Sequence, residues 1–177
     1  TTTVIWTVTD VNGNTNTCTQ DITITDDEQP TITCAADQSQ TADAGLCESL
    51  VTVTSPVTAD NTGVATITND YTNTSDASDT YPVGTTTITW TVTDIHGNAN
   101  TCTQDITVTD DEQPSITCAV NQTQTADAGQ NTAAVTVVAP TTGDNCGIQS
   151  ITNDYNNTAD ATDTYPVGST TITWTVT

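Results

Sequence analysis

The chain has 177 residues, no lysine or arginine, and 22 aspartate or glutamate residues, which give a formal net charge of −22 at pH 7. A chain without cations cannot neutralise phosphate groups, which excludes nucleic acid as a partner, and it offers no basic patch to an anionic membrane surface. It also lacks an apolar run long enough for insertion into a bilayer. Methionine is absent, and we therefore expect a processed protein or a segment of a longer one.

Alternation of apolar residues with threonine is the clearest sign of regular structure. The chain contains 48 threonines, and in residues 85–93 the apolar side chains stand at positions 88, 90 and 92 with threonine between them. A period of two predicts a strand with one buried face, and Thr, Ile, Val and Trp all favour a pleated surface. The sequence therefore predicts an ordered all-β protein rather than a disordered acidic chain.

The sequence repeats itself with a period of 84 residues. Residues 1–93 align without gaps on residues 85–177, and Trp6, Trp90 and Trp174 mark the same position in successive repeats. Repeats of this kind indicate an array of similar modules.

Two acidic segments that end in proline mark the module boundaries. They are Asp26-Asp27-Glu28-Gln29-Pro30 and its copy at 110–114. Proline ends sheet pairing and holds the residue before it in an extended conformation. The predicted division is 1–26 as the C-terminal part of a preceding module, 27–110 as a complete module, and 111–177 as a module that lacks its last strands.

Short strands are predicted throughout the complete module. They lie near residues 31–35, 49–54, 64–69, 85–93 and 100–109, and turns rich in Gly, Asn, Asp and Pro separate them. Short strands, frequent turns and the absence of a helical period predict an antiparallel β-sandwich.

Several motifs recur in register along the chain. In the complete module they are Pro30-x-Ile32-x-Cys34, Asp60-Asn61-x-Gly63, Tyr81-Pro82-Val83-Gly84, and Thr91-Val92-Thr93-Asp94 followed by Gly97-Asn98 and Thr101-Cys102. These motifs resemble the hyalin repeat (HYR) family over the whole 84-residue unit. The resemblance implies tandem immunoglobulin-like β-sandwich modules, located outside the cell or on its surface, that serve spacing and adhesion. It carries over no catalytic residue, and we expect no enzymatic activity.

Six cysteines lack the CxxC spacing of a zinc site. Cys34 and Cys102 are each an even number of residues from apolar residues of the same strand, so we expect both thiols to face the predicted core. The resemblance to hyalin repeats implies that the two cysteines pair within one module. Closing so long a loop contributes about 4 kcal/mol in the chain-entropy treatment. Cys18 and Cys118 occupy the same two roles, and we expect their partners outside residues 1–177. Disulfides indicate an oxidising compartment.

The remaining two cysteines are not matched between repeats. Cys47 aligns with Asn131 and Cys146 aligns with Thr62, so each module keeps one half of a pair. One interpretation is drift that leaves two unpaired thiols, and the other is a disulfide between neighbouring modules or chains. Cysteines bond only when their Cα atoms lie within about 7 Å. We therefore expect such a bond to need modules that lie side by side or fold back.

The acidic segments also predict calcium sites at the module boundaries. Ca²⁺ takes several oxygen ligands, carboxylate clusters hold it at the joints of cadherin-like arrays, and Asp94 ends a strand beside the boundary, as Asp10 does one repeat earlier. The candidate ligands are Asp26, Asp27, Glu28, Asp94, Asp110, Asp111 and Glu112. The alternative is that these carboxylates are only solvated, because Asp is also common in turns for its own hydrogen bonding.

Other polar groups carry weaker signals. His96 aligns with Asn12 in a turn, and we expect it to act neither as a ligand nor as a catalytic base. Acceptor sequences for N-glycosylation occur at Asn73, Asn121 and Asn156.

Two functional hypotheses follow. The first is a structural segment of an extracellular filament or adhesin stalk whose partners are copies of itself. Near-identical repeats are suited to building a long structure, whereas an enzyme needs one module that differs from the others and carries the active site. The second is a calcium-dependent module that binds a surface glycan or protein. Its contacts are expected where the repeats diverge, at 46–50 against 130–134 and at 57–66 against 141–150. The absence of lysine excludes cross-linking through Lys–Asn isopeptide bonds.

Overall fold

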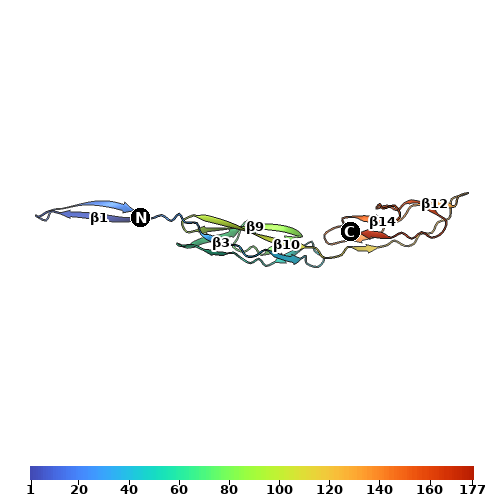
Figure 1. The fold of residues 1–177 in the computed structure, drawn as a ribbon, viewed down its shortest axis with the longest axis horizontal. Helices are drawn as coiled ribbons and strands as arrows, with labels where there is room; N and C mark the ends of the chain where they lie inside the picture. Colours follow the sequence, from blue (N-terminus) through green and yellow to red (C-terminus); the bar gives the residue numbers. More distant parts are fainter. The chain divides into compact units, whose positions relative to one another are not determined.

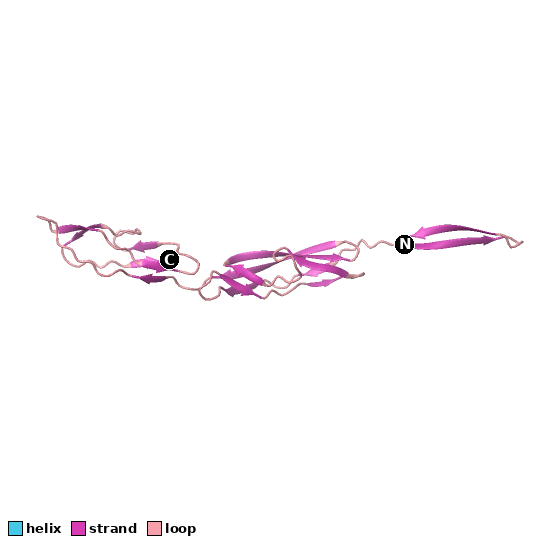
Figure 2. Cartoon of the chain, turned by 180° about the vertical axis from the view of Figure 1, so that it is seen from behind, coloured by secondary structure: helices cyan, strands magenta, loops and turns pink.

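The threonine-rich alternating sequence folds into strands and loops alone (Figure 2). The computed structural model describes all 177 residues and contains 16 strands and no helix, so the all-β prediction is confirmed. The chain divides into two units. The first consists of Thr1–Ala36, Thr54–Ala77 and Ile88–Gln104, and the second of Asp37–Val53, Ser78–Thr87 and Asp105–Thr177.

The first unit begins with an antiparallel hairpin (Figure 1). The strands that lie wholly in the first unit are β1 (Thr2–Thr9), β2 (Thr15–Ile22), β3 (Thr31–Thr33), β6 (Val57–Ala59) and β7 (Val64–Asn69). Strand β1 pairs with β2, β3 with β6, and β7 with the last residues of β9 (Gly84–Asp94), all antiparallel. Strand β9 and its neighbour β10 (Ala99–Thr109) contribute residues to both units.

The second unit holds the other strands. They are β4 (Gln38–Thr41), β5 (Glu48–Val51), β8 (Asp79–Pro82), β11 (Ser115–Thr117), β12 (Thr132–Val135), β13 (Thr141–Gly143), β14 (Ile151–Asn153), β15 (Asp163–Pro166) and β16 (Trp174–Val176). Antiparallel pairs join β5 to β8, β11 to β13, β12 to β15, and β14 to β16. The only larger sheet has the strand order β4-β10-β9-β7.

Alternation along β9 places every second side chain in the core. Ile88, Trp90 and Val92 are fully buried, whereas the threonines between them are not. The indole N–H of Trp90 donates to Gln104 Oε1 at 3.3 Å, and Gln104 Nε2 donates to the carbonyl of Ala36 at 2.9 Å. A buried indole needs such a partner, so Gln104 fixes the position of the central aromatic residue.

The hairpin of β1 and β2 repeats this arrangement without a covering layer. Trp6 lies one repeat before Trp90 and donates to Gln20 at 3.2 Å. It is 59% exposed, whereas Trp90 is 0% exposed. The same local sequence therefore makes the same local structure, and burial depends on the other strands of the module.

Two features of the sheets differ from the prediction. Strand β4 pairs with β10 in parallel, Gln38 lying opposite Ile106, so the sandwich is not wholly antiparallel. A long stretch of chain, rather than a hairpin turn, connects these strands, and a parallel pair is therefore allowed. The short strands β4, β6 and β8 were also not predicted, because three or four residues are too few to show a period.

Candidate functional site: the two module joints

Asp94 organises the turn after β9 at the first joint. Its Oδ1 accepts hydrogen bonds from the backbone N–H groups of His96 and Asn98 at 2.8 and 2.9 Å, and its Oδ2 accepts one from Asn98 Nδ2 at 2.7 Å. Asp10 accepts the same three bonds one repeat earlier. Burial of Asp94 raises its pKa, but these hydrogen bonds lower the pKa by more, so the net pKa lies below the ordinary value of 3.8. Asp94 is therefore an ionised, almost fully buried carboxylate.

Thr62 connects the linker to the loop after β6. Its Oγ1 lies 2.6 Å from Asp26 Oδ2 and 2.9 Å from Asp60 Oδ1, and His96 Nδ1 lies 3.2 Å away. The hydrogen bond from Thr62 is the main cause that lowers the pKa of Asp26. The hydroxyl thus lies beside two carboxylates and an imidazole, and it can donate its single proton to one of the carboxylates at a time.

Asp26, Asp94 and His96 form a compact cluster. Each offers one ligand atom, and the three atoms lie within 4.8 Å of one another. His96 Nδ1 lies 3.3 Å from Asp26 Oδ2, and the side chain of Asp26 is only 8% exposed. The structure thus brings together two of the predicted ligands and adds His96, for which we expected no such role. Residues 27 and 28, also predicted as ligands, are not part of the cluster.

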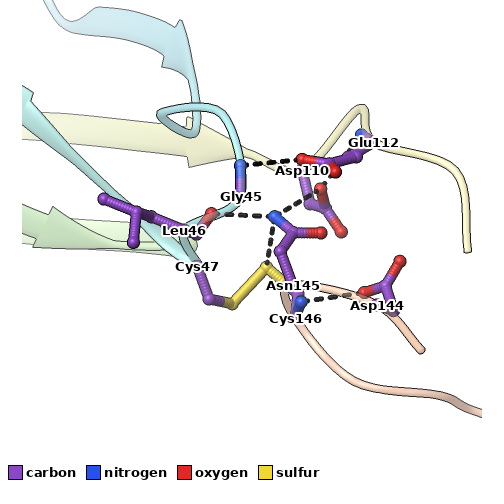
Figure 3. Close-up of a disulfide and its surroundings, with 8 residues drawn as sticks. All are labelled: Gly45, Leu46, Cys47, Asp110, Glu112, Asp144, Asn145 and Cys146. Atoms are coloured by element: carbon purple, nitrogen blue, oxygen red, sulfur yellow. Dashed lines mark hydrogen bonds between the residues drawn. A yellow bond between two sulfur atoms is a disulfide. The ribbon is translucent and has the colours of Figure 1, made fainter.

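At the second joint, a disulfide connects the complete module to the next one (Figure 3). Cys47 lies in the turn before β5 and Cys146 in the loop after β13, and their Cα atoms are 4.8 Å apart. Asn145 Nδ2 donates to the carbonyl of Leu46 at 2.8 Å and to Asp110 Oδ1 at 3.3 Å. We expected this bond to need modules that touch, and within the second unit the contact lies at the joint itself. A turn of one module meets a loop of the next directly beside the linker.

The linker contributes further contacts to the second joint. From the linker, Glu112 Oε2 accepts a hydrogen bond from the backbone N–H of Gly45 at 2.9 Å. Within the loop after β13, Asp144 Oδ1 accepts a hydrogen bond from the backbone N–H of Cys146 at 2.8 Å. The predicted ligands Asp110 and Glu112 therefore contact the joint, whereas Asp111 is exposed and makes none of these contacts. Segments 46–50 and 141–150, where the repeats diverge, meet here.

The other cysteines lie away from this joint. Cys34 and Cys102 form a disulfide with a Cα–Cα distance of 5.9 Å. Cys18 and Cys118 are free and exposed.

Two buried side-chain oxygens accept no hydrogen bond within the protein, and both lie at the joints. They are Asp60 Oδ2 and Asn145 Oδ1. The 84-residue period places Asp60 and Asn145 at adjacent positions of the same loop. Unpaired buried acceptors are rare and need an explanation, and an oxygen without a donor is the type of group that binds a hard cation.

The structure contains no helix of the length and apolarity needed to cross a membrane.

Comparison with known proteins agrees with the resemblance seen in the motifs. The sequence matches the HYR domain over residues 25–108 and again over 109–177. It is 33% identical to a protein named Hyalin from Strongylocentrotus purpuratus over 98% of the chain, and 32% identical to Hyalin from Lytechinus variegatus over 99%. The chain spans 14% of the first relative and 33% of the second. No solved structure matches it. These matches, together with the repeated all-β modules and their disulfides, show that the chain belongs to the HYR domain family of extracellular, adhesion-type repeats.

Proposed function

We propose that the chain is a structural segment of an extracellular filament or a cell-surface adhesin stalk, in which disulfides and calcium fasten consecutive modules. The observation that carries this proposal is the Cys47–Cys146 disulfide between one module and the next. A covalent bond at a joint keeps two modules connected, and a filament or stalk that spans a distance depends on such connections. Domains that bind their targets independently have no need of it.

Repetition gives a second argument for this role. The chain repeats its sequence in register, and its Hyalin relatives extend well beyond the part that it covers. We propose copies of the same module as its principal partners. The alternative, a surface that binds a glycan or another protein, is less favoured, because the divergent segments 46–50 and 141–150 already contact each other at the joint.

Calcium at the joints is the second part of the proposal. With no lysine or arginine in the chain, the carboxylates of Asp26 and Asp94 face each other without a strong cation to balance them. Their oxygens and Asp60 Oδ2 would hold an ion at the first joint, and Asp110, Glu112 and Asn145 Oδ1 would do so at the second. The ion would supply positive charge between the linker and the loop, so that the folded joint binds it and the unfolded chain does not. His96 is not needed for calcium, which prefers oxygen ligands.

Thermal unfolding with and without calcium tests this part. We expect millimolar Ca²⁺ to raise the melting temperature relative to chelator, since a ligand at 100 times its Kd stabilises by about 2.7 kcal/mol. The double variants Asp26→Asn/Asp94→Asn and Asp110→Asn/Glu112→Gln should each lose much of this gain. Asp79→Asn/Asp163→Asn, which removes the same charge from β8 and β15, should keep it. Equal melting in calcium and chelator would leave the carboxylates as solvated linker groups.

Electron microscopy of material isolated from the source tests the filament. Helical or beaded fibres are expected. Dispersed particles that never assemble, at any calcium concentration, would count against a structural role and favour the binding module.

A further inference from the structure

Ser49 on β5 is a fully buried hydroxyl that lies between an amide and a carboxylate. Gln40 Nε2, from β4, lies 2.5 Å from Ser49 Oγ, and the hydroxyl donates to Asp43 Oδ1 at 2.9 Å. Ser49 is 0% exposed. The hydroxyl of Ser49 is a nucleophile, and the carboxylate of Asp43 is a base that accepts its proton. The acyl carbon, Cδ of Gln40, is one bond from the nitrogen that contacts the hydroxyl.

Further hydrogen bonds hold this arrangement in place. Gln40 Nε2 also donates to the carbonyl of Leu50 at 3.2 Å, and Asp43 Oδ2 accepts from the N–H of Leu50 at 3.2 Å. The N–H of Asp43 donates to the carbonyl of Glu48 at 2.8 Å, which closes the turn. Neither the amide nor the carboxylate is free to leave the hydroxyl without losing bonds to β5.

We propose that Ser49 and Gln40 form an intramolecular ester cross-link, with Asp43 as the general base. Asp43 takes the proton of the hydroxyl, and Ser49 Oγ attacks Cδ of Gln40 to give a tetrahedral intermediate. The Cδ–Nε2 bond then breaks, Asp43 returns the proton to Nε2, and ammonia leaves. One hydroxyl and one amide thus become one ester and one ammonia, with no oxidant, reductant or cofactor.

Position and burial favour this step. A nucleophile held beside the group it attacks reacts as if at very high concentration, and the Ser49 hydroxyl is held at Gln40 Nε2, one bond from the carbon under attack. The reaction occurs once in the life of each molecule, so a half-time of hours suffices. The buried Oγ is shielded from water, whereas the side chain of Gln40 reaches the surface, so that ammonia can escape. A chain without lysine has no amine for an isopeptide bond, and a hydroxyl is the nucleophile that remains.

The next module supplies a natural control. It keeps Gln124 and Asp127 at the positions of Gln40 and Asp43, and Ala133 replaces Ser49. Gln124 Nε2 still donates to the carbonyl of Ala134 at 2.9 Å, and Asp127 Oδ2 still accepts from the N–H of Ala134 at 3.4 Å. The amide and the base are therefore in place, and only the nucleophile is missing.

The ester would close the loop that carries Cys47. Residues 40 and 49 are the two ends of this loop, which bonds to Cys146 of the next module. The joint disulfide would then be attached to a covalently closed ring instead of an open turn.

Intact mass of the folded, then reduced and denatured, protein tests the proposal directly. The expected mass is lower than that of the sequence by one ammonia. After reduction and alkylation, cleavage behind Glu48 should leave the peptides that contain Gln40 and Ser49 joined.

Two variants make the test specific. Ser49→Ala, which copies Ala133 of the next module, should restore the full mass. Ala133→Ser should cause the loss of a second ammonia, which maps to Gln124. The full sequence mass with a free Gln40 peptide would overturn the proposal. So would an ammonia loss that maps to Asn12-Gly13, where a succinimide has the same mass.

Discussion

Thr62 occupies at the first joint the position that Cys146 occupies at the second, one repeat later. Cys146 is bonded to Cys47 of the preceding module, whereas Thr62 makes a 2.6 Å hydrogen bond to Asp26 of the linker. The same loop position therefore fastens one joint covalently and the other by hydrogen bonding alone.

This pair of residues suggests a substitution that the fold should accept. Cys146→Thr removes the joint disulfide and introduces the residue found at the first joint. Because closing a loop of this length contributes about 4 to 5 kcal/mol in the chain-entropy treatment, we expect the module of residues 111–177 to unfold at a lower temperature. Cleavage by a Glu-specific protease at Glu112 should also become several times faster. Cys118→Ser, which removes a free thiol, should change neither the unfolding temperature nor the cleavage rate. Equal cleavage rates at Glu112 in Cys146→Thr and Cys118→Ser would contradict a role of the disulfide in holding the joint.

Gln104 is predicted to be critical for the core, although it is polar. Replacing it by alanine leaves the buried N–H of Trp90 without a partner and opens a cavity, at a cost of about 2 to 4 kcal/mol. Chemical denaturation followed by circular dichroism measures this loss. Gln20→Ala, made in the same protein of residues 1–177, is the matched control, because Gln20 contacts Trp6, which is exposed there without the other strands of its module, and the change should cost almost nothing. Similar losses in the two variants would mean that burial does not determine the strength of the pair.

Asp94 should make the thermal stability of its module decrease as the pH falls. Its folded-state pKa lies below 3.8, so the ionised group stabilises the fold above its unfolded pKa, and this stabilisation is lost as the pH falls through the folded pKa. Asp94→Asn is neutral at every pH. The melting temperatures of the wild type and this variant should therefore differ most near about pH 6 and converge toward about pH 2. Asp79→Asn corrects for the general change in charge, and a difference that stays constant with pH would show that the charge of Asp94 is irrelevant.

Thiol labelling should divide the six cysteines into two classes. In a protein limited to residues 1–177, Cys18 and Cys118 are exposed and free, and iodoacetamide should alkylate both without reduction. In a longer chain we expect both to be bonded to cysteines outside these residues. The other four should react only after reduction, with Cys34 linked to Cys102 and Cys47 to Cys146. A non-tryptic protease is needed for the peptide map, since the chain has no lysine or arginine. Labelling of Cys47 or Cys146 without reduction would show that the joint is open in solution.

Long regular strands could be predicted from the sequence, and short ones could not. The alternation at residues 85–93 is long enough to show a period, and it becomes β9 with its buried Ile88, Trp90 and Val92. Residues 38–41 read Gln-Ser-Gln-Thr, which shows no apolar alternation, and they form β4 by pairing with β10. Such a strand is defined by its neighbour rather than by its own composition.

The joints were predictable in residue type but not in geometry. Comparison of the repeats showed that Cys47 and Cys146 are complementary halves, yet nothing in the sequence showed that a turn and a loop from adjoining modules meet beside the linker. The approach of His96 to Asp26 was missed for the same reason, since the tertiary fold alone brings the two together. Ser49, Gln40 and Asp43 lie close in sequence, but only the structure shows that the amide and the carboxylate both reach the buried hydroxyl.

The positions of the two disulfides also determine how far the chain can be drawn out under tension. Once the modules unfold, the shortest covalent path runs from Cys47 directly to Cys146, so residues 48–145 bear no load. Only residues 1–47 and 146–177 can then extend, at about 3.5 Å per residue. If Cys47–Cys146 is reduced, the Cys34–Cys102 bond becomes the limit, and a further stretch of chain is released when it is reduced in turn. Reduction would therefore lengthen a pulled chain in two steps, the larger of which comes from the Cys34–Cys102 bond.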